Sequence, residues 1–290
     1  MIKQKYGVVY TPKSLSNFVA ELLKRASIDE QIKVVLDPAS GECALLAAAM
    51  ETFGNNNEYI GIDVDKDAVN NTKEKFHIIH NDAIMPQNVK KKTAEYWHDK
   101  LPVVDAVIAN PPWSSEKIYE RTDLTAAGFS LISGQYDSYV LFMELAYNIL
   151  RADGLMAFII PDSLFDAQNE NLRRFLLEKT QIKVIARLGE KIFEEVNRAA
   201  TVIICKKAVP DSKSETVCFR LSTEDRRKYL SGQGTLLMYF DKKKHTVLQK
   251  RFLGNSGYNF DIDTHSNEEA LIDKITSSTS DWEQLFVFGR

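Results

Sequence analysis

The sequence predicts an α/β protein built around one open, mostly parallel sheet of seven strands, with the last strand antiparallel and helices on both faces. Short apolar segments rich in Val and Ile alternate with longer segments whose apolar residues recur at helical spacing. Polar residues stand at the ends of four of the short segments, at the edge where open α/β sheets bind ligands. The last two strands, residues 182–188 and 200–206, are joined without a helix, so we expect them to pair antiparallel.

The composition is that of an ordinary globular protein. The chain has 290 residues, of which 44% are hydrophobic and 27% charged, and its net charge is −3. No apolar run approaches the roughly 18 residues of a membrane helix, and the first residues lack the apolar core of a signal peptide, so we expect a cytoplasmic protein with no membrane partner. The cysteines are few and widely spaced, which predicts neither a disulfide framework nor a metal site.

A helix precedes the first strand. Apolar residues recur at helical spacing over residues 14–26, after Thr11-Pro12, and residues 33–36 form the strand. The strand ends in Asp37-Pro38-Ala39-Ser40-Gly41, and a helix rich in Ala and Leu follows over residues 42–52. A turn of small residues between a strand and a helix leaves backbone N–H groups and a helix N-terminus open to a ligand.

The next two strands each end in an acid. Residues 58–63 form the second strand, which ends in Asp63 about twenty residues after the turn. Nucleotide-binding sheets typically have an acid there that binds ribose hydroxyls. Residues 77–82 form the third strand, which ends in Asp82.

The fourth strand delivers four unusual residues to its carboxyl end. Residues 106–109 are apolar on both faces, as in a central strand of a covered parallel sheet, and the chain continues as Asn110-Pro111-Pro112-Trp113. The two prolines forbid both a continuing ladder and an immediate helix, so Asn110 and Trp113 are expected in a rigid loop. An amide and an aromatic ring at this edge suit a flat, hydrogen-bonding substrate such as a base.

The remaining pattern extends the sheet and then changes character. We expect a mobile loop over residues 114–135, helices over 137–150 and 167–179, and a strand over 155–160. Residues 220–251 then hold nine Lys or Arg against three acids, and residues 252–290 hold seven acids against two basic residues. The basic stretch fits contacts to nucleic-acid phosphates, or equally a solvated surface.

In this order, the motifs resemble those of S-adenosylmethionine-dependent DNA adenine-N6 methyltransferases. The series that carries the resemblance is Tyr10-Thr11-Pro12, Asp37 to Gly41, Gly61-Ile62-Asp63, Asn81-Asp82, Asn110 to Trp113 and Phe193. Cofactor motifs before the catalytic motif, with recognition expected last, resemble the gamma class of type I and type IIG restriction-modification systems. The resemblance covers roughly residues 6 to 206 and implies a Rossmann-like class I methyltransferase sheet.

The resemblance also implies which residues bind S-adenosylmethionine. Tyr10, Thr11 and Asp37, with the backbone of Ala39, Ser40 and Gly41, would surround its methionine moiety, Asp63 would bind the ribose and Asp82 the adenine amine. It divides the chain into a helical segment over residues 1–30 that completes this site, a catalytic domain over 31–207 and a basic, then acidic extension over 208–290. The extension is expected to be a linker or the start of a missing target-recognition domain.

The chemistry implied for the catalytic motif follows from the substrate. The exocyclic amine of adenine is a poor nucleophile, and two acceptors aimed at its N–H groups would favour a tetrahedral nitrogen. The amide oxygen of Asn110 and the carbonyl of Pro111 would be these acceptors, and Trp113 and Phe193 would stack on the flipped base.

The effect of Cys43, the partners and the acceptor of the methyl group are not decided by the motifs. Cys43 stands where the family commonly has a second glycine, and a side chain at this place of close backbone approach is expected to weaken cofactor binding or to alter the pose of the cofactor. The partners expected are double-stranded DNA and a specificity subunit, recognition domain or nuclease outside this chain. The alternatives are an amino-group methyltransferase acting on protein glutamine or RNA guanine, and a non-catalytic DNA-binding subunit.

Overall fold

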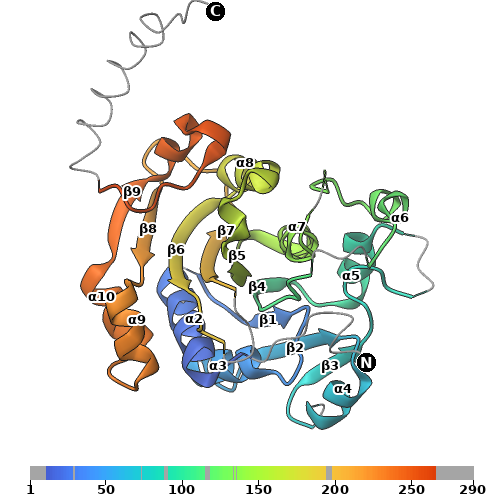
Figure 1. Cartoon of the computed structure of the whole chain (residues 1–290). Helices are drawn as coiled ribbons and strands as arrows, with labels where there is room; N and C mark the ends of the chain where they lie inside the picture. The colour runs from blue at the N-terminus through green and yellow to red at the C-terminus, as the bar shows by residue number, and fades with distance from the viewer. Residues whose placement is uncertain are drawn as a thin grey trace, which may run out of the picture.

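The computed structural model describes residues 11–28, 30–72, 74–87, 91–114, 118–132, 134, 136–193 and 198–265. Within these ranges the chain forms one nine-stranded sheet with helices on both faces (Figure 1). The strand order is β3-β2-β1-β4-β5-β7-β6-β8-β9. The strands are β1 (Val34–Asp37), β2 (Glu58–Asp63), β3 (His77–His80), β4 (Val104–Ala109), β5 (Leu150–Pro161), β6 (Gln181–Gly189), β7 (Ala200–Lys206), β8 (Glu215–Arg220) and β9 (His245–Leu248).

The seven predicted strands are all present, and their directions agree with the prediction. The pairs between β1 and β2, β2 and β3, β1 and β4, and β4 and β5 are parallel. β7 runs antiparallel to both of its neighbours, β5 and β6, so the predicted antiparallel pairing of the last two strands is confirmed.

The predicted number of seven strands was wrong, because β8 and β9 extend the same sheet. β8 pairs parallel to β6, and β9 pairs antiparallel to β8 at the edge. Both strands are short, and β9, the edge strand, is half polar, so their hydrophobic pattern is weak. Residues 215–248 therefore complete the sheet where the sequence suggested a linker or the start of another domain.

Helices cover the sheet in two layers. α2, α3 and α10 pack on one face, and α5, α7 and α8 pack on the other. β4 is buried on both faces: Ala106 and Ile108 contact the α2 side, whereas Val107 and Ala109 contact the α7 side. The helices are α2 (Lys13–Ala26), α3 (Ala44–Phe53), α4 (Lys66–Thr72), α5 (Thr93–Lys100), α6 (Arg121–Ala126), α7 (Tyr139–Ile149), α8 (Glu170–Lys179), α9 (Thr223–Leu230) and α10 (Leu236–Lys243).

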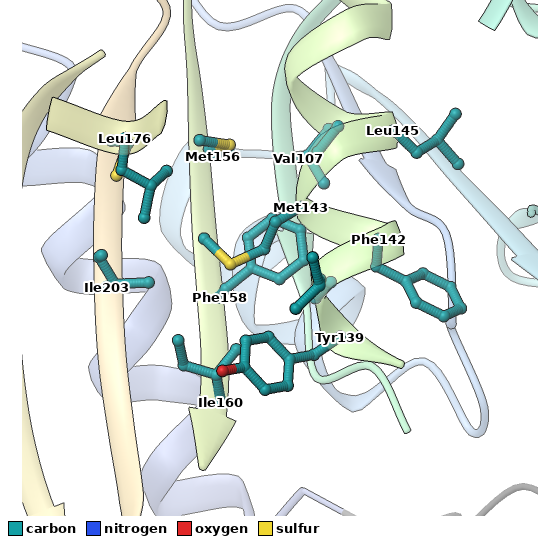
Figure 2. Close-up of a cluster of buried hydrophobic side chains, with 14 of the residues drawn as sticks. Val107, Tyr139, Phe142, Met143, Leu145, Met156, Phe158, Ile160, Leu176 and Ile203 are labelled. Carbon is teal, nitrogen blue, oxygen red and sulfur yellow. The ribbon is translucent and has the colours of Figure 1, made fainter. Parts of the chain in front are cut away.

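The core on the α7 side is dense with large side chains. Met143 and Tyr139 of α7 point toward β5, near Phe158 and Ile160, whereas Phe142 points away from this strand (Figure 2). α7 is apolar nearly all round, so it is buried as a central helix. This packing holds the first turn of α7 against the carboxyl ends of the central strands.

The segment predicted as a mobile loop is partly core. It contains α6, and Leu124, Phe129 and Ile132 are buried. The buried carboxylate of Glu144 in α7 accepts hydrogen bonds from the Ser130 backbone N–H at 2.8 Å and the Leu131 N–H at 3.0 Å. The expectation of a mobile loop is therefore wrong for these residues, whereas residues 115–117, 133 and 135 lie outside the described ranges.

Two further structural findings concern membranes and metals. No helix in the described part of the chain combines the length and the apolar composition needed to cross a bilayer. Across the same ranges, no three His, Cys, Asp or Glu residues are grouped so that they could hold a metal ion.

Candidate active site

A pocket lies at the carboxyl ends of β1, β2, β3 and β4, where α7 begins. Ile118, Tyr119 and Phe142 also line it. Tyr10 lies outside the described residues. Of the twelve residues that the sequence analysis assigns to cofactor binding or catalysis, eight line this pocket: Thr11, Asp37, Ala39, Ser40, Gly41, Asp63, Asp82 and Asn110.

The turn after β1 is tied to the end of β2. The Gly41 N–H donates to Asp63 Oδ2 at 2.7 Å, and the Asp65 N–H donates to Asp63 Oδ1 at 2.7 Å. The Ala39 N–H donates to Asp37 Oδ1 at 3.0 Å. Asp63 therefore positions the turn as well as presenting a carboxylate to the pocket.

Gly61 is required by the packing of this turn. A Cβ at Gly61 would lie 2.6 Å from Ser40 Oγ and 2.6 Å from Ile78 Cδ1. Because Gly61 has no side chain, Ser40 can pack directly over β2, where its N–H donates to the Ile62 carbonyl at 3.1 Å. Gly41 has φ +48, a left-handed conformation that favours glycine, and a Cβ there would point into open space.

Cys43 adopts the glycine-like conformation without entering the pocket. Its φ is 59° and ψ is 28°, in the left-handed region, at the residue that precedes α3. The thiol is fully buried in the core beneath α2 and α3, and Cys43 is not among the residues that line the pocket. Burial raises the pKa of the thiol to about 11, so it is protonated at neutral pH. The side chain thus adds backbone strain rather than an obstruction in the pocket.

Two acids in the pocket are perturbed by burial. Asp37 is 1% exposed, and burial raises the pKa of its carboxyl to about 8, with a further rise from the charge of Asp63 and an opposing effect of the Ala39 N–H. Burial also raises the pKa of Asp63 above its usual value, against the two N–H groups that bind it. The raised pKa values mean that burial disfavours the ionised form of both carboxyl groups, and perturbed acids in a pocket mark a candidate functional site.

Asp82 is held by contacts from both sides. The Ile84 and Met85 N–H groups donate to its Oδ1 at 2.8 and 3.0 Å, and the Tyr119 hydroxyl donates to its Oδ2 at 2.7 Å. Tyr119 comes from the segment after the catalytic motif, so nothing in its local sequence indicated this contact. The hydroxyl and the backbone together fix the direction in which the carboxylate faces the pocket.

Asn110 follows β4 directly and its amide orientation is set by Thr11. Asn110 Nδ2 donates to Thr11 Oγ1 at 3.1 Å. With the amino end of the amide at Thr11, the amide oxygen is the end that would accept from a substrate. A residue before α2 thereby positions the amide at the end of a strand ninety-nine residues later in the chain.

The loop after Asn110 is clamped by the start of α7. Ser138 Oγ donates to the Pro112 carbonyl at 2.5 Å and accepts from the Ser114 N–H at 3.2 Å, and the Ser138 N–H donates to the Ser114 carbonyl at 2.8 Å. Arg198 Nη1 donates to the Trp113 carbonyl at 2.6 Å, and its Nη2 donates to buried Asp137 at 3.1 Å. Sequence reasoning missed Ser138 and Arg198 because a single serine or arginine carries no local signal.

Trp113 and Phe193 do not line the pocket but pack against each other. Their ring centroids are 5.3 Å apart with the planes at 90°, and the side chains are only 7% and 2% exposed. Trp113 Nε1 also donates to the Ile159 carbonyl at 3.3 Å. Pro111 is buried, and it is Pro112 that lines the pocket.

The pocket can bind a polar ligand with a positive centre. It presents carboxyl groups from the ends of three neighbouring strands, backbone N–H groups at a tight turn and one strand-terminal amide. The apolar side chains of Val64 and Phe142 also line it and would suit a flat ring.

Comparisons with known proteins give the family and the fold. Residues 2–251 match the family described as N-6 DNA Methylase. The chain is 23% identical over 210 residues to the type II methyltransferase M.AccI of Acinetobacter calcoaceticus, covering 70% of this chain and 37% of that protein. It is 24% identical over 242 residues to the type I restriction enzyme MjaVII methylase subunit of Methanocaldococcus jannaschii, covering 75% and 39% respectively.

The fold is similar to that of the type IIG restriction endonuclease BpuSI, with a TM-score of 0.67 and 16% identity, over 93% of this chain and 34% of that chain. The chain thus spans less than half the length of each of these proteins. The match to the family runs from residue 2 to residue 251 of 290 and includes the whole pocket, β8 and β9. The chain belongs to the N-6 DNA methylase family.

Proposed function

We propose that this chain transfers a methyl group from S-adenosylmethionine to the N6 amine of an adenine flipped out of double-stranded DNA, within a restriction-modification system. The observation that carries the proposal is the position of Asn110: its amide, oriented by Thr11, lines the same pocket as Asp37, Asp63 and Asp82. Membership of the N-6 DNA methylase family and the names of the relatives support the same reaction.

The residues of the pocket fit S-adenosylmethionine. The Asp63 carboxylate would bind the ribose hydroxyls, Asp82 would accept from the adenine amine, and Asp37 and Thr11 would face the charged methionine moiety. Asp37 supports this fit, since a buried carboxyl group with a pKa of about 8 gains from a neighbouring cation. The cofactor supplies an electrophilic methyl group on a positively charged sulfur.

The protein contributes two hydrogen-bond acceptors to the chemical step. Asn110 Oδ1 and the Pro111 carbonyl would accept the two N–H groups of the adenine amine, which concentrates the lone pair on nitrogen and directs it away from both acceptors. The N–C bond forms as the C–S bond breaks, and the nitrogen then loses one proton to solvent. No strong base is needed before attack, because the ammonium formed is acidic.

The finer class and the partners are further parts of the proposal. The motif order supports the gamma class, with Asn110 to Trp113 as its catalytic motif. We propose that the catalytic domain extends through β9, since β8 and β9 belong to the same sheet and to the region that matches the family. Target recognition, and any nuclease, would then come from a specificity subunit or from chain after this domain. Without them, the 290 residues should methylate with little sequence preference.

The experiment that tests the function compares possible methyl acceptors. The protein is incubated with S-adenosylmethionine labelled in its methyl group and with DNA, RNA or a glutamine-containing peptide. The DNA is a duplex with an adenine opposite an abasic site, because an unpaired base is cheaper to flip. We expect label in N6-methyladenine; label only in RNA or peptide would refute the proposal.

Asn110→Ala should lower the rate of methyl transfer by about 100-fold or more, because one of the two acceptors is lost. Calorimetry should give a cofactor affinity within about twofold of wild type, since Asn110 faces the substrate. Asn56→Ala, at an exposed asparagine, is the matched control and should have wild-type activity. Retained turnover in Asn110→Ala would remove Asn110 from the mechanism.

A further inference from the structure

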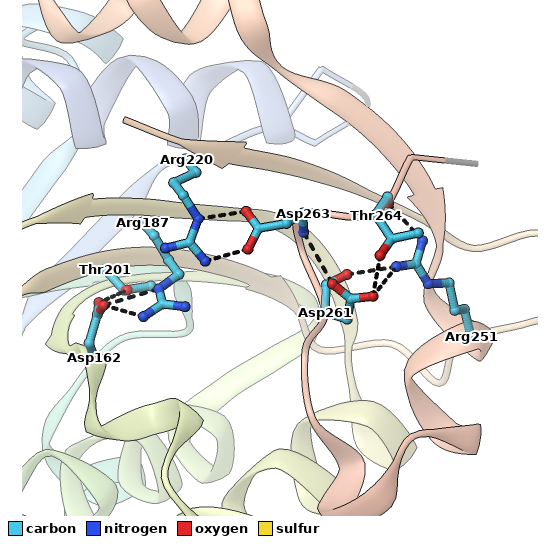
Figure 3. Close-up of polar contacts among 8 residues, drawn as sticks. All are labelled: Asp162, Arg187, Thr201, Arg220, Arg251, Asp261, Asp263 and Thr264. Atoms are coloured by element: carbon cyan, nitrogen blue, oxygen red, sulfur yellow. Dashed lines mark hydrogen bonds and ion pairs between the residues drawn. The ribbon is translucent and has the colours of Figure 1, made fainter. Parts of the chain in front are cut away.

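The basic stretch of residues 220–251 contains a few cations that have no side-chain partner among the residues that the structure describes. Of its nine Lys and Arg, five form ion pairs: Arg220 with Asp263, Lys228 with Glu224, Lys243 with Asp225, Lys244 with Asp241 and Arg251 with Asp261. Figure 3 shows how Arg220 and Arg251 are held by the acidic segment after β9. Within the described residues, the others make no side-chain ion pair or hydrogen bond: Arg226, Arg227, Lys242 and Lys250.

Lys242 and Lys250 lie away from the active site. Lys250 follows β9, and the last residue of β9, Leu248, pairs with Glu215 at the start of β8. Lys250 therefore lies toward the amino end of β8, opposite to the strand ends that form the pocket. Lys242 is next to Asp241, which binds Arg25 in the last turn of α2. That turn is roughly 18 Å along the helix from its start near Thr11, at 1.5 Å per residue.

Helix α9 lies on the active-site side of the molecule. The Tyr229 hydroxyl is 2.7 Å from Ser14 Oγ, in the first turn of α2, and α9 lies beside α2 in Figure 1. The Leu221 N–H donates to the Arg187 carbonyl at 2.8 Å, so the chain enters α9 from the carboxyl end of β8, beside that of β6. Arg226 and Arg227 are therefore at the same edge of the sheet as Asn110.

Arg226 is held in a defined place at this edge. A Cβ at Gly189 would lie only 1.9 Å from Arg226 Nη1, so the guanidinium rests directly on the glycine at the end of β6. Gly189 has φ +80, pairs with Ala200 of β7 and leads within four residues to Phe193, which packs on Trp113. The guanidinium thus lies against the backbone that carries the proposed stacking residue.

Two other arginines at this edge, Arg187 and Arg198, already have partners. Arg187 donates twice to Asp162, as Figure 3 shows. Its guanidinium also lies 4.1 Å from the Phe165 ring centroid. Arg198 binds Asp137 and the Trp113 carbonyl. Arg226 is the arginine at this edge that is both fixed by packing and, among the described residues, free of a carboxylate.

We propose that Arg226 binds a backbone phosphate of the DNA strand that contains the target adenine, an inference that rests on the proposed function. β6 is three strand spacings from β4, or roughly 14 Å. At about 3.4 Å per nucleotide along a strand, this places the contacted phosphate within about four nucleotides of the flipped base. Gly189 is the residue that makes room for the guanidinium.

The test compares Arg226→Ala with Arg227→Ala. Both variants lose one positive charge on consecutive residues of α9, but Arg227 is exposed and makes no contact with Gly189. Binding is measured by fluorescence anisotropy with the duplex that has an adenine opposite an abasic site. The salt concentration is varied between roughly 50 and 200 mM, a range over which contacts to phosphates lose much of their contribution to the affinity. Thermal unfolding of both variants checks that α9 is intact.

Arg226→Ala should weaken binding by about tenfold at the lowest salt and reduce the slope of log K against log salt by about one. Arg227→Ala should change affinity by less than about twofold, because it removes long-range attraction alone. Equal losses in the two variants, or a wild-type chain that does not bind this duplex, would overturn the inference.

A second measurement locates the phosphate. Neutral methylphosphonate linkages are placed one at a time around the target adenine. One position should weaken the wild type by about tenfold and leave Arg226→Ala unchanged, because the contact is already lost. If every position weakens both proteins equally, Arg226 does not bind a phosphate. Methyl transfer to adenine by the wild type, measured in parallel, keeps this outcome distinct from failure of the proposed function.

Discussion

Replacing Asp37 by Asn should stabilise the protein without ligand and weaken its binding of the cofactor. The pKa of Asp37 is about 8 in the folded protein because the carboxyl is buried, against 3.8 for the free group. Between these two values the folded protein binds a proton that the unfolded chain does not bind. The free energy of unfolding therefore falls as pH rises, by about 1.4 kcal/mol per pH unit.

The size of the effect follows from this window. At pH 7 the need to keep Asp37 protonated in the folded protein lowers the free energy of unfolding by about 4 kcal/mol, relative to a side chain that does not titrate. Near pH 4 this loss vanishes, because the unfolded chain also binds the proton. Asn keeps the side-chain oxygen that accepts from the Ala39 N–H. Asp37→Asn should thus raise the midpoint of thermal unfolding by about 10 °C at pH 7, and the gain should shrink steadily toward pH 4.

Two assays check this reasoning. Thermal unfolding of the wild type and of Asp37→Asn is followed from pH 4 to pH 8, and parallel pH profiles would refute the raised pKa. Calorimetric titration with S-adenosylmethionine at pH 7, in two buffers of different ionisation enthalpy, should show release of nearly one proton by the wild type, since the bound cation favours the ionised carboxylate. Asp37→Asn should release none and bind more weakly.

Three more substitutions test the geometry of the pocket. Cys43→Gly relieves the backbone strain of a non-glycine residue in the left-handed conformation but removes a buried thiol. The two effects oppose each other, so the free energy of unfolding in urea should change by less than about 1 kcal/mol and the cofactor affinity by less than about twofold. A large change in affinity would show that the thiol acts on the pocket. Gly61→Ala forces Ser40 to move, so it should lower the free energy of unfolding by about 1–3 kcal/mol in the same assay and weaken cofactor binding in calorimetry. Adding Ser40→Gly to this variant should restore part of the stability and part of the affinity. No recovery would mean that Ser40 is not the group displaced. Ser138→Ala removes two hydrogen bonds to the loop after Asn110, so kcat should fall by about tenfold with the cofactor affinity unchanged; an unaltered kcat in the methyl-transfer assay would show that Ser138 does not position the loop.

Local patterns predicted the central sheet and most of the pocket. Buried strands such as β4 are short apolar runs, and their ends are marked by Asp37, Asp63 and Asn110, so both their existence and their polar edge can be identified from the sequence. Parallel strands bring these ends together, which is why residues far apart in the chain line one pocket.

The contacts that escaped prediction depend on packing between distant segments. Tyr119 binds Asp82, and Ser138 at the start of α7 binds the Pro112 carbonyl, through contacts between segments that are distant in the sequence, and neither contact has a signature in nearby residues. The orientation of Cys43 is similar: the sequence shows a side chain where the family has a glycine, but the direction of that side chain depends on the core beneath α3. The edge strand β9 is half polar, so its pairing with β8 decides its structure more than its own sequence does.

The packing of Trp113 on Phe193 constrains how a base could enter the site. Their edge-to-face contact is worth about 0.5–1.5 kcal/mol, and stacking of a base on an aromatic ring is worth about 1–3 kcal/mol. A base held by both rings would therefore repay their separation. Stacking must also offset the few kcal/mol needed to move the base out of the duplex, so the two rings alone leave a net free energy of base insertion close to zero. The remaining free energy has to come from groups outside the aromatic pair. The proposed acceptors, Asn110 and the Pro111 carbonyl, and the proposed contact of Arg226 with a DNA phosphate would supply it, so methyl transfer should depend on salt as well as on Asn110.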